Sequence, residues 1–402
     1  MPERNTASKA KQQRNLSRGR QDKTCAQNRK LTAERKVTAG GTKRRTSSND
    51  NRAIGMTFQS KVHNSTKSTS QKVMLSPKHA AAERFMDSVV DIGMRGIRKE
   101  FILQVKTYVP SKPATTWKEE SSKDKNRYED VPLLDETRVK LKNNTETGKP
   151  SDDYIHASYV KVHEDLTYIC AQGPIPNTIP HFLMMCVQEK TKVILQLCSF
   201  FEDGSEKCAV YLPSESDGND WKSFGPVEIR VTDRQTNIPA MKKVVKTKLQ
   251  IKYKDETHEL QHLLYSGWPD HCPPESVSTC KEMRAYIQKH YDKKPIIAHC
   301  SAGIGRTGTF VAIEMALHRI LTLADASFTL PDIVKELRDQ RMKAIQNDQQ
   351  YVFVYRCTID ILIHEDVLEK SDKVVAFIND YDELVARKKA TRAEGKNKAK
   401  TG

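Results

Sequence analysis

The sequence predicts an α/β domain, and three patterns support this prediction. Residues 81–101 carry apolar side chains at helical spacing, among them Phe85, Val89, Val90 and Ile97. Residues 225–265 alternate apolar and polar side chains in several short runs, as strands of a large sheet do. Between residues 295 and 313, a short apolar run, a glycine-containing loop and an apolar helical pattern follow one another. This order predicts a strand, a tight loop and a buried helix, the last extending over residues 309–323.

The charge of the chain is concentrated at its two ends. Residues 1–80 contain 19 Lys and Arg against 4 Asp and Glu, a net charge of +15, and their one aromatic residue is Phe58. Such a segment cannot bury enough apolar surface to offset its ordering entropy, which predicts a basic disordered tail. We therefore expect a folded domain over residues 81–370. A charged C-terminal tail is expected over residues 371–402, basic from residue 387.

Features of export, lipidation and membrane insertion are missing from the sequence. No apolar stretch follows Met1, Pro2 excludes N-myristoylation, and no apolar run reaches the length of a membrane span. The nine cysteines form no C-x-x-C pair, which favours free thiols in a reducing compartment. We expect a cytoplasmic protein, and Lys43-Arg44-Arg45 leaves a nuclear address open.

The loop from Cys300 to Arg306 is the candidate functional site. It lies between the strand pattern 295–299 and the helix pattern, and it contains Gly303 and Gly305, with Gly308 just beyond. Its backbone N–H groups and the N-terminus of the following helix would point at one place. The loop therefore predicts a binding site for a phosphate group.

Two side chains indicate what happens to that phosphate. Cys300 is at the first position of the loop, where the N–H groups and the helix dipole favour the thiolate and so a nucleophile. Arg306 can offer a planar fork to two phosphoryl oxygens. The hydroxyl of Thr307 is suited to stabilise the thiolate when it leaves.

The segment His299-Cys300-Ser301-Ala302-Gly303-Ile304-Gly305-Arg306-Thr307-Gly308 resembles the signature loop of the tyrosine-specific protein phosphatase family. Further similar motifs run from about residue 125 to residue 353. The resemblance implies a large, twisted mixed β-sheet flanked by helices. It also implies hydrolysis of phosphotyrosine in proteins through a cysteinyl-phosphate, with no metal or other cofactor.

The resemblance assigns substrate contacts to two places. Tyr128 and Asp130 match the loop that sets the depth of the pocket, where Tyr128 would stack on the substrate ring and Asp130 would hold substrate N–H groups. In the signature loop, the cradle residues that would contact the phosphate are Ser301, Ala302, Gly303, Ile304, Gly305 and Arg306. The pocket would be too deep for phosphoserine to reach the nucleophile.

The resemblance also implies how protons and water are handled. Asp270, beside the hinge residue Trp268, would be the general acid and later the general base. Glu202 would orient Arg306, and Lys207 would contact Asp270. The remaining assignments place the hydrolytic water at Gln350, with Gln346 assisting, and give His299 a role in orienting the loop.

Two departures from the family pattern leave alternatives open. His156 stands where the family has Asn, and Cys272 stands where glycine is common. An inactive phosphotyrosine-binding module, recruited through its basic tails, is therefore an alternative to the enzyme. A dual-specificity phosphatase is a weaker alternative, because it would lack Tyr128. Cys272 is also a candidate redox partner of Cys300, and residues 1–80 have acidic lipid or nucleic acid as candidate partners.

Overall fold

A computed structural model describes residues 76–142 and 153–401, with side chains up to residue 394. Nearly all of the predicted N-terminal tail lies outside the described residues. Among the described helices, none combines the length and hydrophobicity needed to cross a bilayer.

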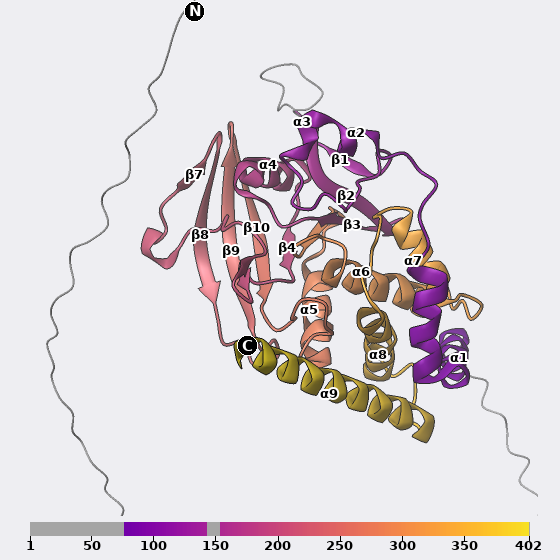
Figure 1. Cartoon of the computed structure of the whole chain (residues 1–402). Helices are drawn as coiled ribbons and strands as arrows, with labels where there is room; N and C mark the ends of the chain where they lie inside the picture. Colours follow the sequence, from indigo (N-terminus) through magenta and orange to yellow (C-terminus); the bar gives the residue numbers. More distant parts are fainter. Residues whose placement is uncertain (1–75, 143–152, 402) are drawn as a thin grey trace, which may run out of the picture. The chain divides into compact units, whose positions relative to one another are not determined.

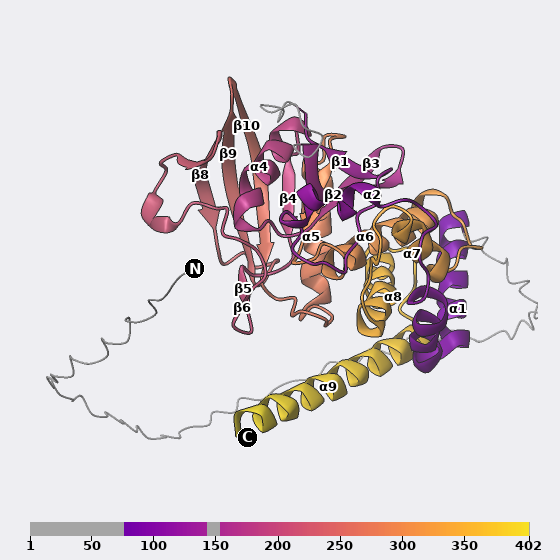
Figure 2. The same cartoon turned by 45° about the horizontal axis from the view of Figure 1, so that its top comes forward.

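A nine-stranded mixed sheet forms the centre of the domain (Figure 1). Its strand order is β1-β2-β3-β11-β4-β10-β9-β8-β7. The central strands β3, β11, β4 and β10 pair in parallel, and the other pairs are antiparallel. The strands of this sheet are β1 (Arg138–Lys140), β2 (Tyr154–His163), β3 (Leu166–Ala171), β4 (Val193–Gln196), β7 (Lys222–Phe224), β8 (Val227–Gln235), β9 (Val244–Tyr253), β10 (Glu256–Tyr265) and β11 (Ile296–His299). A separate short hairpin, visible in Figure 2, consists of β5 (Phe201–Glu202) and β6 (Ser205–Glu206).

Helices pack around this sheet. The α-helices are α1 (Pro77–Glu100), α2 (Thr115–Lys118), α3 (Glu120–Lys123), α4 (Ile179–Gln188), α5 (Val277–His290), α6 (Arg306–Leu317), α7 (Leu330–Arg338), α8 (Asp348–His364) and α9 (Asp372–Thr401). Short 3-10 turns (Pro176–Thr178, Glu215–Asp217) and π-helical turns (Phe101–Val105, His318–Thr322) complete the set. Helix α4 packs on β8, β9 and β10, and α6 packs on β2, β3 and β11. The predicted α/β class, with a large mixed sheet and flanking helices, is confirmed.

Strand β11 positions the candidate site. All four of its residues are buried, and it lies between β3 and β4, to which it is parallel. The chain leaves β11 at Cys300 and enters α6 at Arg306. The carboxyl ends of parallel strands are where open α/β sheets bind ligands, so the loop 300–306 lies at such a place.

Helix α1 is bent. Gly93 has a φ of +63°, a conformation that residues with a side chain seldom adopt, and the helix kinks there. Of the predicted apolar stripe, Phe85, Val89 and Ile97 are buried, but Val90 is 50% exposed. The inclusion of Val90 was wrong, because it lies on the solvent side of the first half of the helix.

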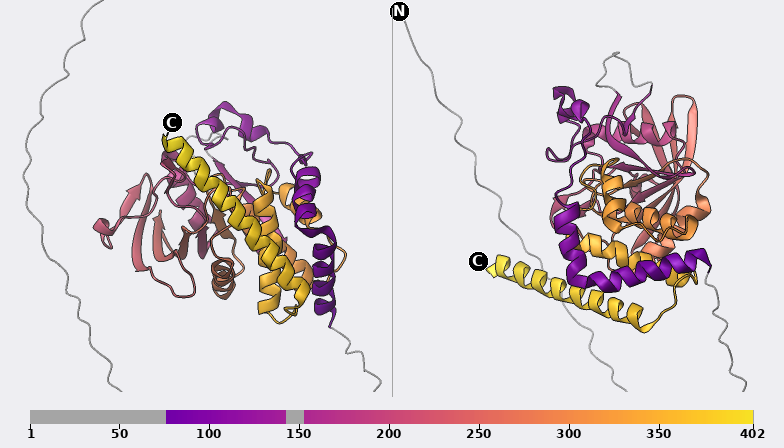
Figure 3. Two further views of the ribbon diagram at one scale, coloured as in Figure 1. Left: turned by 60° about the horizontal axis from the view of Figure 1, so that its bottom comes forward. Right: turned by 90° about the vertical axis from the view of Figure 1, so that its right-hand side faces the viewer.

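The C-terminal segment that the sequence marked only by its charge forms helix α9. Val374, Phe377, Tyr381 and Leu384 are buried and recur at intervals of three or four residues. That spacing is typical of one apolar face of a helix. This face explains why α9 packs on α1 and α8 (Figure 3).

Candidate active site

The signature loop is held tightly against the sheet. Gly303 has a φ of +69°, and a Cβ atom there would lie 2.0 Å from the carbonyl oxygen of Ala171 in β3. Only glycine fits this position. The N–H of Gly303 donates to Cys300 Sγ at 3.3 Å. The loop therefore directs at least one backbone amide at the sulfur.

Arg306 lies beside the loop with 1% of its surface exposed. Its Nη1 donates to Glu202 Oε1 at 2.7 Å and to the carbonyl oxygen of Trp268 at 3.0 Å. Burial opposes the charge of the guanidinium, but Cys300, Cys198 and Glu202 outweigh this effect and raise its pKa. Among the described residues, Nε and Nη2 make no hydrogen bond, although Nη2 lies 3.2 Å from Asp270 Oδ1. The two nitrogens thus form a buried, charged fork.

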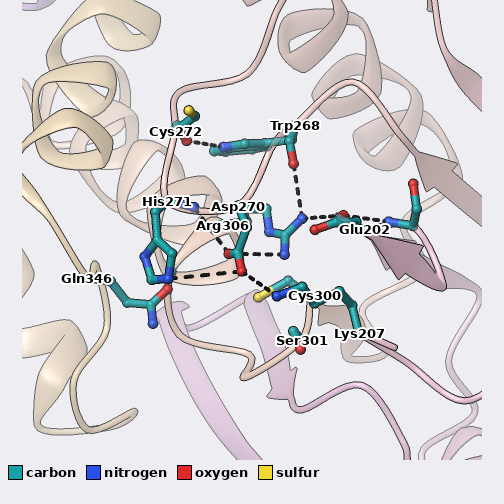
Figure 4. Close-up of polar contacts among 12 residues, drawn as sticks. Glu202, Lys207, Trp268, Asp270, His271, Cys272, Cys300, Ser301, Arg306 and Gln346 are labelled. Atoms are coloured by element: carbon teal, nitrogen blue, oxygen red, sulfur yellow. Dashed lines mark hydrogen bonds and ion pairs between the residues drawn. The ribbon is translucent and has the colours of Figure 1, made fainter. Parts of the chain in front are cut away.

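Asp270 lies over the same cradle, as Figure 4 shows. Sequence analysis expected Lys207 to contact it, and Lys207 Nζ donates to Asp270 Oδ2 at 3.0 Å. Burial of the carboxyl group favours its neutral form, but Arg306, Lys207 and His271 outweigh burial and lower the pKa of Asp270. Trp268 is buried, and its Nε1 donates to the carbonyl oxygen of Cys272 at 2.8 Å. Asp270 is therefore a carboxylate in the unliganded site, on a loop fixed by Trp268.

A cavity of about 580 Å³ opens above Cys300. Tyr128 forms part of its wall, and the hydroxyl groups of Tyr128 and Ser301 lie 2.7 Å apart. Ala302, Ile304 and Val131 form a small apolar cluster with Tyr128 packed against it. The wall predicted from Tyr128 and the floor predicted from the signature loop are thus one continuous surface.

Asp130 and Lys343 meet at the mouth of this cavity. The carboxylate of Asp130 is 79% exposed, and its Oδ2 lies 3.3 Å from Lys343 Nζ. Lys343 also donates to the carbonyl oxygen of Asp130. Sequence analysis missed Lys343, because it lies 213 positions from Asp130 in the sequence and only the fold brings the two together.

The two predicted glutamines pack against the loop at Gly305, and Gln346 also lines the cavity. Gln350 is fully buried, and its Oε1 accepts from the backbone N–H of Gln346 at 2.9 Å. A Cβ atom on Gly305 would lie 2.1 Å from Gln346 Oε1 and 2.9 Å from Gln350 Nε2. Within the described part of the chain, Gln350 Nε2 and Thr307 Oγ1 are buried without a hydrogen-bond partner. Such groups are available to a bound water or phosphate.

His299 belongs to a buried network. Its Nδ1 lies 3.3 Å from the carbonyl oxygen of Cys300, and its Nε2 lies 2.9 Å from the hydroxyl of Tyr211. That hydroxyl also donates to Gln196 and contacts His262. Burial lowers the pKa of His299 to about 4, so it is neutral at physiological pH. Among the described residues, no group of three or more His, Cys, Asp or Glu side chains is arranged to hold a metal ion.

Arg341 and His156 form a second network that sequence analysis did not foresee. Helix α7 ends at Arg338, and Arg341 lies in the turn that follows. Its guanidinium donates to the carbonyl oxygens of Gly303 and Ala302 at 3.1 and 3.0 Å. His156 Nδ1 lies 3.1 Å from Arg341 Nη2, and His156 Nε2 lies 2.9 Å from the carbonyl oxygen of Val131. The substituted histidine therefore connects the signature loop to the Tyr128 loop.

His156 should make the fold sensitive to acid. Burial, followed by the charge of Arg341, lowers its pKa from 6.5 to about 3. Below pH 6.5 the unfolded chain binds a proton that the native chain excludes, so stability falls as the pH falls. We expect His156→Asn to reduce this slope by roughly 1.4 kcal/mol per pH unit between pH 6 and 4.

Urea unfolding at a series of pH values measures this effect, with the exposed His364→Asn as the control. An unchanged slope in His156→Asn would contradict a neutral His156 in the native state.

Cys272 and Cys300 do not form a pair in this structure. Neither forms a disulfide, and Cys272 lies on the far side of Trp268 from Cys300 (Figure 4). The Cys272 sulfur instead contacts the guanidinium of Arg392. The neighbouring His271, not Cys272, adopts a positive φ, of 56°. A cysteine at position 272 therefore needs no unusual backbone conformation.

Comparisons with known proteins agree with this geometry. The family model for protein-tyrosine phosphatase matches residues 122–360. Tyrosine-protein phosphatase non-receptor type 20 of Rattus norvegicus is 33% identical over 270 residues, which cover 66% of this chain and 61% of the relative. Type 12 of Homo sapiens is 33% identical over 248 residues, which cover 61% of this chain and 31% of the relative. The chain thus spans less than two thirds of the length of these relatives.

A solved structure of PTPN18 in complex with HER2 phosphopeptides superposes with a TM-score of 0.61 and 26% sequence identity. The match covers 70% of this chain and 98% of that one. The extent of the family match, together with the cradle around Cys300 and Arg306, shows that this chain belongs to the protein-tyrosine phosphatase family.

Proposed function

We propose that this protein hydrolyses phosphotyrosine in other proteins through a cysteinyl-phosphate intermediate. The observation that carries the proposal is the buried fork of Arg306, with Nε and Nη2 lacking hydrogen bonds within the described residues. Arg306 lines the same cradle as Cys300 and Asp270. A buried cation with two unused donors is costly without a ligand, and a phosphoryl group supplies two acceptor oxygens in the matching geometry.

In the first step, the Cys300 thiolate attacks phosphorus and the P–O bond to the tyrosine oxygen breaks. Asp270 gives its proton to that oxygen, so the tyrosine leaves as a neutral phenol. Arg306 and the loop amides, including that of Gly303, stabilise the charge spread over the transferring phosphoryl group. The product of this step is a thiophosphate ester on Cys300.

In the second step, water attacks that phosphorus and the S–P bond breaks. The Asp270 carboxylate takes a proton from the water, and the electron pair of the broken bond restores the Cys300 thiolate. The amide of Gln350, buried against Gly305, and the side chain of Gln346 are placed to orient the water. Inorganic phosphate is released.

The charges around Asp270 predict a pH effect. Lys207 helps to lower the pKa of Asp270, and the first step needs the protonated acid. Removing Lys207 raises that pKa, so a larger fraction of Asp270 is protonated at any pH above it. We expect Lys207→Met to move the high-pH limb of the kcat/KM profile to higher pH.

Lys207→Arg retains the charge and is the control. A limb that moves to lower pH in Lys207→Met, or that persists in Asp270→Asn, would contradict this assignment of the acid.

Tyr128 forms part of the wall of the cavity that contains Cys300. We expect this wall to restrict the substrate to phosphotyrosine, because the phosphoserine side chain is shorter. Phosphotyrosine-containing proteins are the corresponding partners, and the PTPN18 complex with phosphopeptides supports this class. The test is hydrolysis of one peptide prepared with phosphotyrosine and with phosphoserine. Activity on the first alone supports the proposal, activity on both indicates a dual-specificity phosphatase, and binding without turnover indicates an inactive module.

For the N-terminal segment we propose an acidic partner, on the basis of its net charge of +15. Binding to anionic lipid vesicles and to nucleic acid, with and without residues 1–75, tests this proposal and separates the two partners. The cytoplasm is the proposed compartment, with the nucleus as the second candidate.

A further inference from the structure

A second cavity, of about 560 Å³, lies between helices α1 and α9. It is lined by residues beside the kink of α1 at Gly93 and by residues of α9. The right-hand view of Figure 3 shows α9 passing beneath the bent helix α1. We call it the α1–α9 groove. Its lining residues are Ile92, Gly93, Met94, Arg95, Arg98, Asp380, Leu384, Arg387, Lys388 and Thr391.

The charge in the groove is strongly unbalanced. Among the described lining residues, Arg95 and Arg98 project from α1 and Arg387 and Lys388 project from α9, against one carboxylate, that of Asp380. Among the described residues, Arg95, Arg387 and Lys388 have no carboxylate within ion-pairing distance. Arg98 is paired with Asp348, so three cations without a carboxylate partner face one cavity, and they repel one another unless an anion lies between them.

The chemistry of the lining selects the class of anion. Guanidinium groups bind phosphate through paired hydrogen bonds, and three of the four cations are arginines. The groove is larger than one phosphate, and its cations come from two helices. Among the described residues that line it, none is aromatic, so they offer no surface for stacking a nucleotide base.

Residues that line the groove, or adjoin it in the chain, are connected to the loop that carries Asp270. Thr391 lines it, and the next residue, Arg392, donates from Nη2 to the carbonyl oxygen of Asp270 at 3.1 Å. Arg98 forms an ion pair with Asp348, in the first turn of α8. The adjacent Asn347 donates from Nδ2 to the carbonyl oxygen of His271 at 3.1 Å. Each wall of the groove is therefore connected, through a neighbouring residue, to the loop that carries Asp270, which we call the acid loop.

We propose that the α1–α9 groove binds a compact polyphosphorylated anion of the inositol polyphosphate class, either free or as a lipid headgroup. The bound anion bridges α1 and α9 and, through Arg392, holds the acid loop over the cradle. The ligand thereby acts on the loop that carries Asp270 without entering the catalytic cavity.

The binding test uses inositol hexakisphosphate and the full chain carrying Arg306→Met, which removes anion binding in the cradle. Calorimetry at about 0.15 M salt limits weak binding to other basic segments. We expect Arg95→Glu and Lys388→Glu each to weaken binding at least tenfold. Lys389→Glu makes the same charge change on an exposed residue outside the groove and should alter affinity less than twofold.

Equal weakening by Lys389→Glu, or no saturable binding to either the soluble ligand or the vesicles described below, would overturn the site. Thermal unfolding without ligand checks that the variants are folded. Vesicles containing phosphatidylinositol bisphosphate provide a second arm. Binding to soluble ligand identifies a free polyphosphate, and groove-dependent binding to vesicles alone identifies a headgroup.

The link to the acid loop is tested with the active protein at saturating phosphotyrosine peptide, where competition in the cradle does not affect the rate. We expect saturating ligand to raise kcat at least twofold. Arg392→Ala should abolish this increase and leave ligand affinity intact. Binding without a change in kcat would overturn the link, and a protein with no phosphatase activity would still report on the site through the calorimetric arm.

Discussion

Replacing Cys300 by serine should reduce phosphotyrosine turnover by roughly 10⁵-fold or more, because the first covalent bond cannot form. A serine hydroxyl stays protonated at neutral pH, and the hydrogen bond that the Cys300 side chain accepts comes from a backbone N–H, which would not remove that proton. The cradle of Arg306 and backbone amides remains, so the variant should still bind phosphotyrosine peptide. Steady-state phosphate release measures the loss.

Cys280→Ser makes the same replacement at another buried cysteine, in α5, and should retain activity. Rapid acid quenching followed by mass spectrometry should find the phosphoryl group on Cys300 in the wild type and in Cys280→Ser. Turnover like that of the wild type in Cys300→Ser would reject the mechanism.

Asp270→Ala is expected to lower kcat by about 10²- to 10⁴-fold, the usual contribution of a positioned general acid. The change also removes a carboxylate that lies 3.2 Å from Arg306 Nη2. The guanidinium fork then meets the phosphate without competition, so peptide affinity should be retained or increased. Titration of labelled phosphotyrosine peptide into Cys300→Ser and into the double variant Cys300→Ser, Asp270→Ala measures that affinity.

The dependence on the leaving group separates an acid from a structural residue. An aryl phosphate with an acidic phenol needs little protonation as it departs, so Asp270→Ala should impair it far less than it impairs a phosphotyrosine peptide. Equal losses for both substrates would contradict general acid catalysis and point to a damaged loop.

The part of the site that could be predicted from sequence is the part encoded locally. The order strand, loop and helix follows from residues 295–313 alone. Gly303 is required because its position touches Ala171, and Cys300 and Arg306 belong to the same short segment. Local sequence therefore fixed the cradle, and family resemblance brought in the more distant Asp270.

The part that could not be predicted depends on contacts between distant residues. Arg341 and His156 are 185 positions apart, and neither lies in a pattern that indicates a pairing. The contact of Arg392 with the acid loop spans 122 positions. Helix α9 is different, because the spacing of Val374, Phe377, Tyr381 and Leu384 is readable in the sequence.

The network of Arg341 has a consequence for small molecules directed at this pocket. Its guanidinium hydrogen-bonds the signature loop at the bottom of the pocket and, through His156, is connected to the loop that carries Tyr128. The distance between the Cys300 sulfur and the Tyr128 loop is then set by buried hydrogen bonds. The signature loop cannot move to fit an inhibitor that is too long or too short for this distance. Changes to the shape of an inhibitor are therefore useful only on the side of the loop that carries Asp270.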